Sequence, residues 1–215
     1  MEEKLDRRIP KAFYITLVLF LSIRGKINFL QLGRFSTRCE QSFRYFFEKG
    51  IDFLCFNTAL IKTHIEGKTA IAFDPSYISK AGKKTSGIGY FWSGCAGRSK
   101  WGLEFCGLAV LDLTRQTAFH LNGFQTIDLK DEESLLQFYC RKLLEQKNAL
   151  LSISQYIVAD AYFSKLNFVN PLRLSGFHVV SRLRDDADLQ YVFSGKQHKG
   201  RGRKKKYDGK IDFKN

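Results

Sequence analysis

The sequence predicts an α/β protein in which a mixed sheet with crossover helices follows a small helical segment. Three observations support this class. From residue 69 onward, short apolar runs and helical patterns alternate in the order β-β-β-α-β-α-β, which favours a sheet with helices packed on its faces. The first third of the chain has helical rather than alternating apolar spacing. At 44% hydrophobic and 14% aromatic residues, the 215-residue chain can bury a substantial core.

The first third is expected to form short helices. An apolar helix over residues 12–23 ends before Gly25, and Asn28 is placed to cap a second helix that Gly33 ends. The stretch Thr37-Arg-Cys-Glu40 matches a capping box at the start of a third helix. The spacing of that helix directs Phe43, Phe46 and Phe47 toward a core.

Two short helices joined by a glycine-containing turn are typical of a helix-turn-helix, a motif that reads DNA. Arg38 and Arg44 would lie on the exposed face of the second helix of this pair. The alternative, which the sequence leaves open, is that the two helices form only a packing unit.

The sheet is expected to begin with a short strand over residues 69–73 that runs into Asp74-Pro75, because proline ends or edges a strand. Strands over 102–113 and 117–124 follow, joined by a turn at Asp112-Leu-Thr-Arg115. Three carboxylates at Asp131-Glu-Glu133 indicate a helix start, and a buried strand over 155–159 ends at Asp160. A helix over 164–174, interrupted at Pro171, and a strand over 177–180 complete the order.

The charge balance favours a polyanionic partner. The formal net charge is +14, and neutralised phosphates release counterions, so nucleic acid is the leading class. Residues 196–215 carry nine basic and two acidic groups, half of the excess. This segment is either a solvated tail or a flexible arm that follows a phosphate backbone, through Arg201, Arg203, Lys204, Lys205 and Lys206.

Cysteines and apolar runs exclude other classes. Five scattered cysteines without a C-x-x-C pair indicate reduced thiols in a cytosolic compartment rather than disulfides or a zinc site. The apolar run from residue 12 to residue 23 is too short for a confident membrane span and lacks a cleavage site, so we expect no membrane partner.

Two aspartates follow strands of the predicted sheet. If the strands that end at Asp74 and Asp160 are neighbours, both carboxylates meet at one edge of the sheet. Hard oxygen ligands in a cleft suit Mg²⁺ or Mn²⁺, which take their remaining ligands from water and substrate phosphates. The alternative is that each aspartate only caps a strand end or the next helix.

The local sequences resemble those of bacterial insertion-sequence transposases of the DDE type. The blocks Asp74-Pro-Ser-Tyr-Ile-Ser-Lys-Ala-Gly-Lys-Lys-Thr-Ser-Gly87 and Val158-Ala-Asp-Ala-Tyr-Phe-Ser164 are similar to those around the first two catalytic aspartates of that family. Further similar blocks are Phe91-Trp-Ser-Gly94, Lys100-Trp-Gly-Leu-Glu104, Leu108-Ala-Val-Leu-Asp112 and Gly176-Phe-His-Val-Val-Ser-Arg-Leu-Arg184.

The resemblance implies a ribonuclease-H-like fold and metal-dependent cleavage and transfer of DNA strands. Residues 1–66 would be a helical DNA-binding segment, 67–195 an incomplete catalytic core, and 196–215 the start of an inserted or C-terminal region. The implied metal ligands are Asp74 and Asp160, with Mg²⁺ or Mn²⁺ as cofactor. The implied partners are double-stranded DNA at element ends and targets, with self-association on the DNA, in the bacterial cytoplasm at the nucleoid.

The chain departs from the family pattern at the third ligand. That ligand is a glutamate on a later helix, within a Tyr…Arg…Glu…Lys signature, and no counterpart precedes Asn215. Glu104, Asp112 and Asp185 are poor substitutes, because they lie in strand interiors or in a turn. Whether this chain is an enzyme therefore stays open, and the alternative is a DNA-binding remnant that cannot cut.

Basic and aromatic residues near Asp74 have two interpretations each. Lys80, Lys83 and Lys84 either contact DNA phosphates beside Asp74 or belong to a solvated loop. For Trp92 and Trp101 we expect core packing rather than stacking on unpaired bases.

Overall fold

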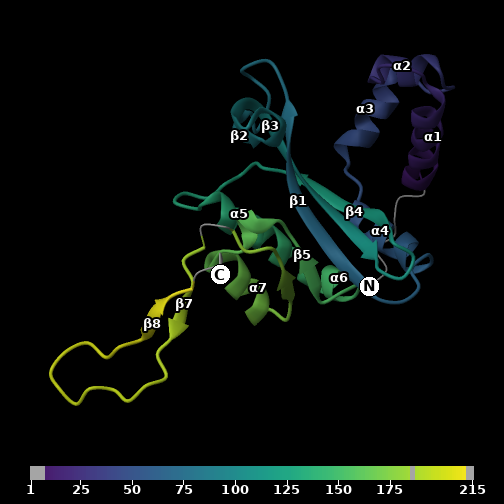
Figure 1. Ribbon diagram of the computed structural model, residues 1–215. Helices are drawn as coiled ribbons and strands as arrows, with labels where there is room; N and C mark the ends of the chain where they lie inside the picture. The colour runs from purple at the N-terminus through teal and green to yellow at the C-terminus, as the bar shows by residue number, and fades with distance from the viewer. Residues whose placement is uncertain (1–7, 185–186, 212–215) are drawn as a thin grey trace. The chain divides into compact units, whose positions relative to one another are not determined.

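The computed structural model describes residues 8–184 and 187–211, and Figure 1 shows the path of the chain. The chain divides into a helical unit that ends at Phe53 and a sheet unit that begins at Leu54. Helix α4 (Phe53–Lys62) therefore falls almost wholly in the sheet unit, although the sequence places its segment in a helical region through residue 66. The reason is packing, because Leu54 and Ile61 join the core of the sheet unit.

The helical unit consists of α1 (Arg8–Ser22), α2 (Phe29–Arg34) and α3 (Glu40–Glu48). Its small core contains Leu19, Ile23, Leu32 and Phe43. The predicted cap of α2 is confirmed, because Asn28 Oδ1 accepts the N–H of Gln31 at 2.9 Å. Isolated helices of this length are marginally stable in water, so the stability of this unit depends on the packing of its small core.

Two predictions in the helical unit are wrong. The capping box at residues 37–40 does not form: the residue before α3 is Cys39, which makes no side-chain cap hydrogen bond, and Glu40 instead pairs with Arg44. Gly33 lies inside α2 rather than ending it. A Cβ at Gly33 would lie 3.0 Å from the backbone nitrogen of Glu40, so its smallness allows the two helices to approach each other.

The third helix buries two of the three phenylalanines that the pattern directs inward. Phe43 and Phe46 are buried, whereas Phe47 is 46% exposed. The side chain of Phe47 lies at the surface with its ring edge-on to Phe46 and Phe29.

The sheet unit contains the mixed, ribonuclease-H-like sheet that the sequence predicts. Its strands are β1 (Thr69–Ser79), β2 (Gly89–Ser93), β3 (Arg98–Asp112), β4 (Thr117–Gln125), β5 (Tyr156–Val158) and β6 (His178–Val180). Strand β3 is antiparallel to β1, β2 and β4, while β1, β5 and β6 are parallel. The central order β3-β1-β5-β6 places the strands bearing Asp74 and preceding Asp160 side by side.

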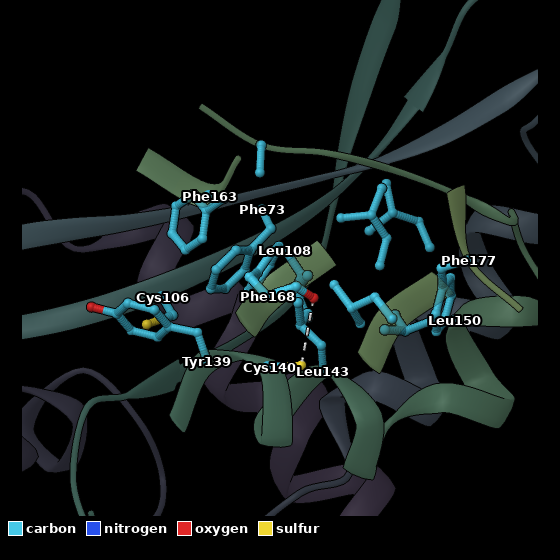
Figure 2. Packing of buried hydrophobic residues seen from close by; sticks show 14 of the residues in the cluster. Phe73, Cys106, Leu108, Tyr139, Cys140, Leu143, Leu150, Phe163, Phe168 and Phe177 are labelled. Carbon is cyan, nitrogen blue, oxygen red and sulfur yellow. Dashed lines mark hydrogen bonds between the residues drawn. The ribbon is translucent and has the colours of Figure 1, made fainter. Parts of the chain in front are cut away.

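Helices α5 (Leu135–Glu145), α6 (Lys147–Leu151) and α7 (Leu166–Leu174) accompany this sheet. Figure 2 shows how aromatic rings from the strands and helices meet in the core. The Phe73 ring of β1 contacts Tyr139 of α5 edge-on at 5.7 Å, Phe163 edge-on at 5.3 Å and Phe168 of α7 face-on at 6.3 Å. Burial of such large rings is the main stabilisation of the unit.

Strand β1 is longer than predicted, because it continues through Asp74-Pro75 to Ser79. The N–H of Leu113 donates to the Lys68 carbonyl, and in an antiparallel pair every second residue hydrogen-bonds to the same neighbouring strand. Pro75 lies an odd number of residues after Lys68, so its nitrogen points away from β3. On that side β5 pairs with β1 only at Ile71 and Ala72. Proline therefore removes no ladder hydrogen bond, and the strand does not end.

Two helix predictions also need correction. Helix α5 begins after Ser134, whose hydroxyl accepts from the N–H of Gln137 in a reciprocal capping box, so the carboxylates at residues 131–133 precede the cap. Helix α7 is not interrupted at Pro171. Phe168 and Leu172, both fully buried, anchor the helix on either side of the proline.

The turn at Asp112 and the strand that follows it are confirmed. Asp112 Oδ1 accepts the N–H groups of Thr114 at 2.9 Å and Arg115 at 3.0 Å. Strand β2 and helix α6 were not predicted. The short β2 pairs with the first residues of β3, which begins at Arg98, before the predicted strand start at residue 102.

Part of the basic C-terminal segment is a hairpin rather than a free tail. Strand β7 (Gln190–Val192) pairs with β8 (Tyr207–Lys210), and the loop between them carries the cations. Gln197 ties the loop together, because its amide donates to the Lys205 carbonyl at 2.7 Å and accepts the Lys205 N–H at 3.1 Å. Asp185 and residues 212–215 lie outside the described residues. Among those described, no helix is long and apolar enough to cross a membrane.

Candidate metal and DNA site

Asp74 and Asp160 occupy matching positions on neighbouring parallel strands. Strand β1 pairs with β5 in the register Ile71 with Ile157 and Ala72 with Val158. Two residues further along, that register places Asp74 opposite Asp160. Asp74 lies on β1 where β5 has ended, and Asp160 is the second residue after β5. The proximity expected for the two carboxylates is thus a consequence of strand pairing.

The two carboxylates affect each other electrostatically. Both residues are exposed. Partial burial, and secondly the negative charge of Asp160, raise the pKa of Asp74 above that of an ordinary aspartate. A cation bound near both groups would relieve this repulsion.

Asp160 is also anchored by local hydrogen bonds. Its Oδ1 accepts the N–H of Tyr162 at 2.9 Å and so caps the 3-10 helix η2 (Ala161–Phe163). Its carbonyl oxygen accepts the hydroxyl of Ser181 at 2.7 Å. The cap interpretation is therefore correct for Asp160, and it fixes one carboxylate oxygen while the side chain stays exposed.

The donor set at this edge fits a hydrated hard cation. Two exposed carboxylates supply oxygen ligands, and Mg²⁺ characteristically keeps several waters beside one or two carboxylates. Across residues 8–184 and 187–211, no group of three or more His, Cys, Asp or Glu side chains is arranged to hold a metal ion. Asp74 and Asp160 could thus hold the ion only together with water or substrate oxygens.

Glu104, a poor substitute for the third metal ligand, is a buried carboxylate. It is 5% exposed, and its Oε1 accepts the hydroxyls of Thr126, at 2.7 Å, and of Tyr139. Burial, and then the bond to Glu104, raise the pKa of the Tyr139 hydroxyl. Both hydroxyls use the same oxygen in the interior, so Glu104 supports the core beneath the site. No sequence signal distinguishes this role, because it depends on contacts between distant elements.

Glu104 and the two aspartates act on the same neighbouring groups. Burial raises the pKa of the Cys106 thiol to about 12, and Glu104 and Asp74 add to this effect. Burial likewise raises the pKa of Tyr162, with added effects of Glu104 and Asp160. Carboxylates thus act on both groups, while the positive charge of Arg184 opposes their effect at Tyr162.

The lysines of the β1–β2 loop lie close to Asp74 along the chain. Lys80, Lys83 and Lys84 are all exposed. The loop is held to the sheet at two points, because Trp101 Nε1 donates to the Gly82 carbonyl at 3.0 Å and Gln125 Nε2 donates to the Ser86 carbonyl at 2.8 Å. The lysines are thus presented to solvent on an anchored loop.

The two tryptophans do not pack in the core as expected. Trp92 is 62% exposed and Trp101 is 40% exposed. Both lie where β2 pairs with the first residues of β3, and neither belongs to the buried core of the sheet unit.

Arg38 and Arg44 belong to the helical unit. Arg44 lies on α3, forms an ion pair with Glu40 and lies over the Phe29 ring at 4.8 Å. Arg38 precedes α3 and is half-buried, so the prediction that it lies on the exposed face of that helix is wrong. A DNA contact by Arg44 would have to compete with Glu40.

The cations of the β7–β8 hairpin are exposed, and among them Lys205 and Lys210 have ion-pair partners within the chain. Lys205 pairs with Asp208 at 2.6 Å and lies over the Phe193 ring at 4.8 Å. The remaining predicted contacts are Arg201, Arg203, Lys204 and Lys206, all exposed. The hairpin loop thus presents exposed cations that are neighbours along the chain.

Comparisons with known proteins give only distant similarities. No family model and no curated protein matches the chain. Two solved structures of endonuclease V from Ciona intestinalis are similar, both in complex with DNA containing an inosine followed by a ribo-adenosine. One has 12% identity and a TM-score of 0.31 over 60% of this chain and 54% of that chain. The other has 13% identity and a TM-score of 0.33 over 63% and 57%. The matched region thus spans little more than half of those chains.

Proposed function

We propose that this chain is a DNA transposase, or part of one, that binds element ends and cleaves and transfers DNA strands with a divalent metal. The observation that carries the proposal is the register of β1 and β5, which sets Asp74 opposite Asp160 at an exposed edge. The resemblance of the surrounding sequence blocks to those of DDE transposases indicates the reaction, and the net charge of +14 favours a polyanionic substrate.

The proposal assigns a role to each group. Asp74 and Asp160 hold Mg²⁺ or Mn²⁺, which when bound activates the attacking oxygen and stabilises the leaving one. The Tyr162 N–H fixes the Asp160 carboxylate. Lys80, Lys83 and Lys84 neutralise phosphates beside the site, and the hairpin cations contact the duplex further away. Self-association on DNA and action at the bacterial nucleoid belong to the same proposal.

A second function is favoured by one specific observation. Among the described residues no third carboxylate joins the aspartate pair as a metal ligand. Under this alternative the chain occupies element ends as a DNA-binding protein and does not cut.

Nicking of supercoiled DNA in Mg²⁺ or Mn²⁺ tests the proposal. Asp74→Asn and Asp160→Asn are each expected to lower the nicking rate by more than the roughly 10- to 100-fold that loss of an outer-shell partner of a metal costs. The matched control is Asp131→Asn, which removes an exposed carboxylate of the loop before α5.

The results separate the candidates. Cleavage that both variants abolish and the control retains supports the metal site that the transposase requires. Dependence of that cleavage on element-end sequence then separates a transposase from a generic structure-specific nuclease. Tight DNA binding without cleavage in either metal supports the DNA-binding alternative. Cleavage that persists in both aspartate variants contradicts the assigned site.

A further inference from the structure

Exposed aromatic rings form a row on one face of the β2–β3 extension. In the antiparallel register Tyr90 lies opposite Trp101, and Trp92 follows two residues later on β2. Cross-strand partners and residues two apart share a face, so these three rings project from the same side. Tyr90 is 73% exposed and Trp92 is 62% exposed.

The row is ordered by contacts at its centre. The Trp101 ring lies edge-on to Tyr90 with centroids 5.2 Å apart, and its Nε1 donates to the Gly82 carbonyl at 3.0 Å. Its backbone carbonyl accepts the Tyr77 hydroxyl at 2.8 Å. These partners hold Trp101 in place while leaving 40% of it exposed. The faces of Trp101 and Tyr90 are therefore preorganised before any ligand binds.

The same face of the sheet leads toward Asp74. The β1–β3 register pairs Ile78 with Leu103, Ser76 with Phe105 and Asp74 with Gly107, and each pair shares the face of Trp101. Phe105 is 39% exposed. A Cβ at Gly123 would lie 2.2 Å from its ring, so Phe105 covers this glycine on β4. An apolar path thus connects the aromatic row with the carboxylate.

The charged residues of the segment that carries the row are all positive. Residues 75–103 contain five cations and no aspartate or glutamate. Three of these cations, Lys80, Lys83 and Lys84, lie on the loop that Trp101 holds through Gly82. Aromatic faces bordered by lysines complement a chain that alternates flat bases with negative phosphates.

We propose that Tyr90, Trp92 and Trp101 form a stacking platform for unpaired bases of a DNA strand that leads to Asp74. The inference rests on the proposed function. It adds that part of the DNA substrate is single-stranded, with its bases unpaired. Paired bases stack on each other inside the duplex and cannot offer their faces to these rings, whereas unpaired bases can.

An acidic protein surface would also match the lysines, but it would have no need of aromatic faces. The exposed π surfaces therefore favour bases over an acidic peptide. The distinction can be measured, because a strand that lacks bases retains the phosphates and loses the stacking partner.

Intrinsic fluorescence reports on the platform directly, because Trp92 and Trp101 are the only two tryptophans of the chain. We would titrate the full chain, in EDTA, with a single-stranded oligothymidylate, an abasic strand of equal length, and a duplex of equal length. The oligothymidylate is expected to quench the tryptophan emission and to bind more tightly than the abasic strand. Trp92→Ala should weaken its binding by about 5- to 100-fold, the cost of losing one base stack.

The variants control for folding and for general aromatic loss. Trp92→Phe retains an aromatic face and should restore most of the affinity, whereas Tyr156→Ala removes a half-exposed ring on β5 and should leave the affinity unchanged. Equal affinity for the abasic strand, unquenched emission, preference for the duplex, or no effect of Trp92→Ala would each overturn the platform. Because the assay contains no metal, its outcome is independent of cleavage: the platform can fail while Asp-dependent nicking persists, and the reverse.

Discussion

At the residue scale, the raised pKa of Asp74 links the site to stability. Burial and the charge of Asp160 disfavour the ionised form in the fold. A carboxyl group whose pKa is raised in the fold costs more to ionise in the folded chain than in the unfolded chain. Its ionisation therefore lowers the free energy of unfolding as the pH rises through that pKa. The effect is absent at low pH, where the group is protonated in both the folded and the unfolded chain.

Asp74→Asn is therefore expected to raise the melting temperature at pH 7 and to have no effect near pH 3. Thermal unfolding of both proteins across this range measures the difference, with Asp131→Asn as the control. A variant that is less stable at pH 7 than the wild type would contradict the assigned electrostatics.

Glu104 is the second prediction at this scale. Glu104→Ala leaves the buried hydroxyls of Thr126 and Tyr139 without their acceptor, which should cost about 1–3 kcal/mol for each hydroxyl. Glu104→Gln retains an acceptor oxygen and should cost less. Urea unfolding measures both. Equal loss in the two variants would show that the charge, rather than the acceptor, is what the core requires.

At the element scale, two capping patterns in the sequence have different outcomes. The capping box at Ser134 forms, so Ser134→Ala should lower the free energy of unfolding by about 1 kcal/mol. The pattern at Thr37 does not form a cap, so Thr37→Ala should change it by less than about 0.5 kcal/mol. Chemical denaturation of the two variants makes this comparison, and a larger loss at Thr37 would contradict the structure of the α3 start.

Local chemistry explains which elements the sequence predicts. Asn28 and Asp112 act through bonds to residues two or three positions away, so their cap and turn are readable from the chain. The passage of β1 through Pro75 depends instead on which neighbouring strand is present on each side. No local pattern contains that information.

The candidate site divides in the same way. The pairing of Asp74 with Asp160 follows from strand adjacency, which the order of elements and the family resemblance made predictable. The buried role of Glu104 and the exposure of Trp92 do not follow, because the first needs Tyr139 of α5 and the second depends on tertiary packing around β2 and β3.

At the scale of the whole molecule, the uneven charge predicts how DNA binding responds to salt. Each phosphate contact adds about 0.9 to the slope of log affinity against log salt for duplex DNA. Replacing Arg201, Arg203 and Lys204 with glutamine should therefore reduce the slope by up to about 3. A charge-matched control replaces Lys130, Lys147 and Arg173, and should retain the slope. An identical reduction in both variants would show that the hairpin has no particular role.

The most direct test of the account is Mn²⁺ binding, measured by electron paramagnetic resonance, because it needs neither DNA nor cleavage. The shared site predicts that Asp74→Asn and Asp160→Asn each weaken Mn²⁺ binding by at least about 10-fold, while Asp131→Asn binds like the wild type. At a free Mn²⁺ concentration a hundredfold above its dissociation constant, the wild type should gain about 2.7 kcal/mol of stability. Mn²⁺ affinity that is unchanged in either aspartate variant would contradict a cation shared by the two strands.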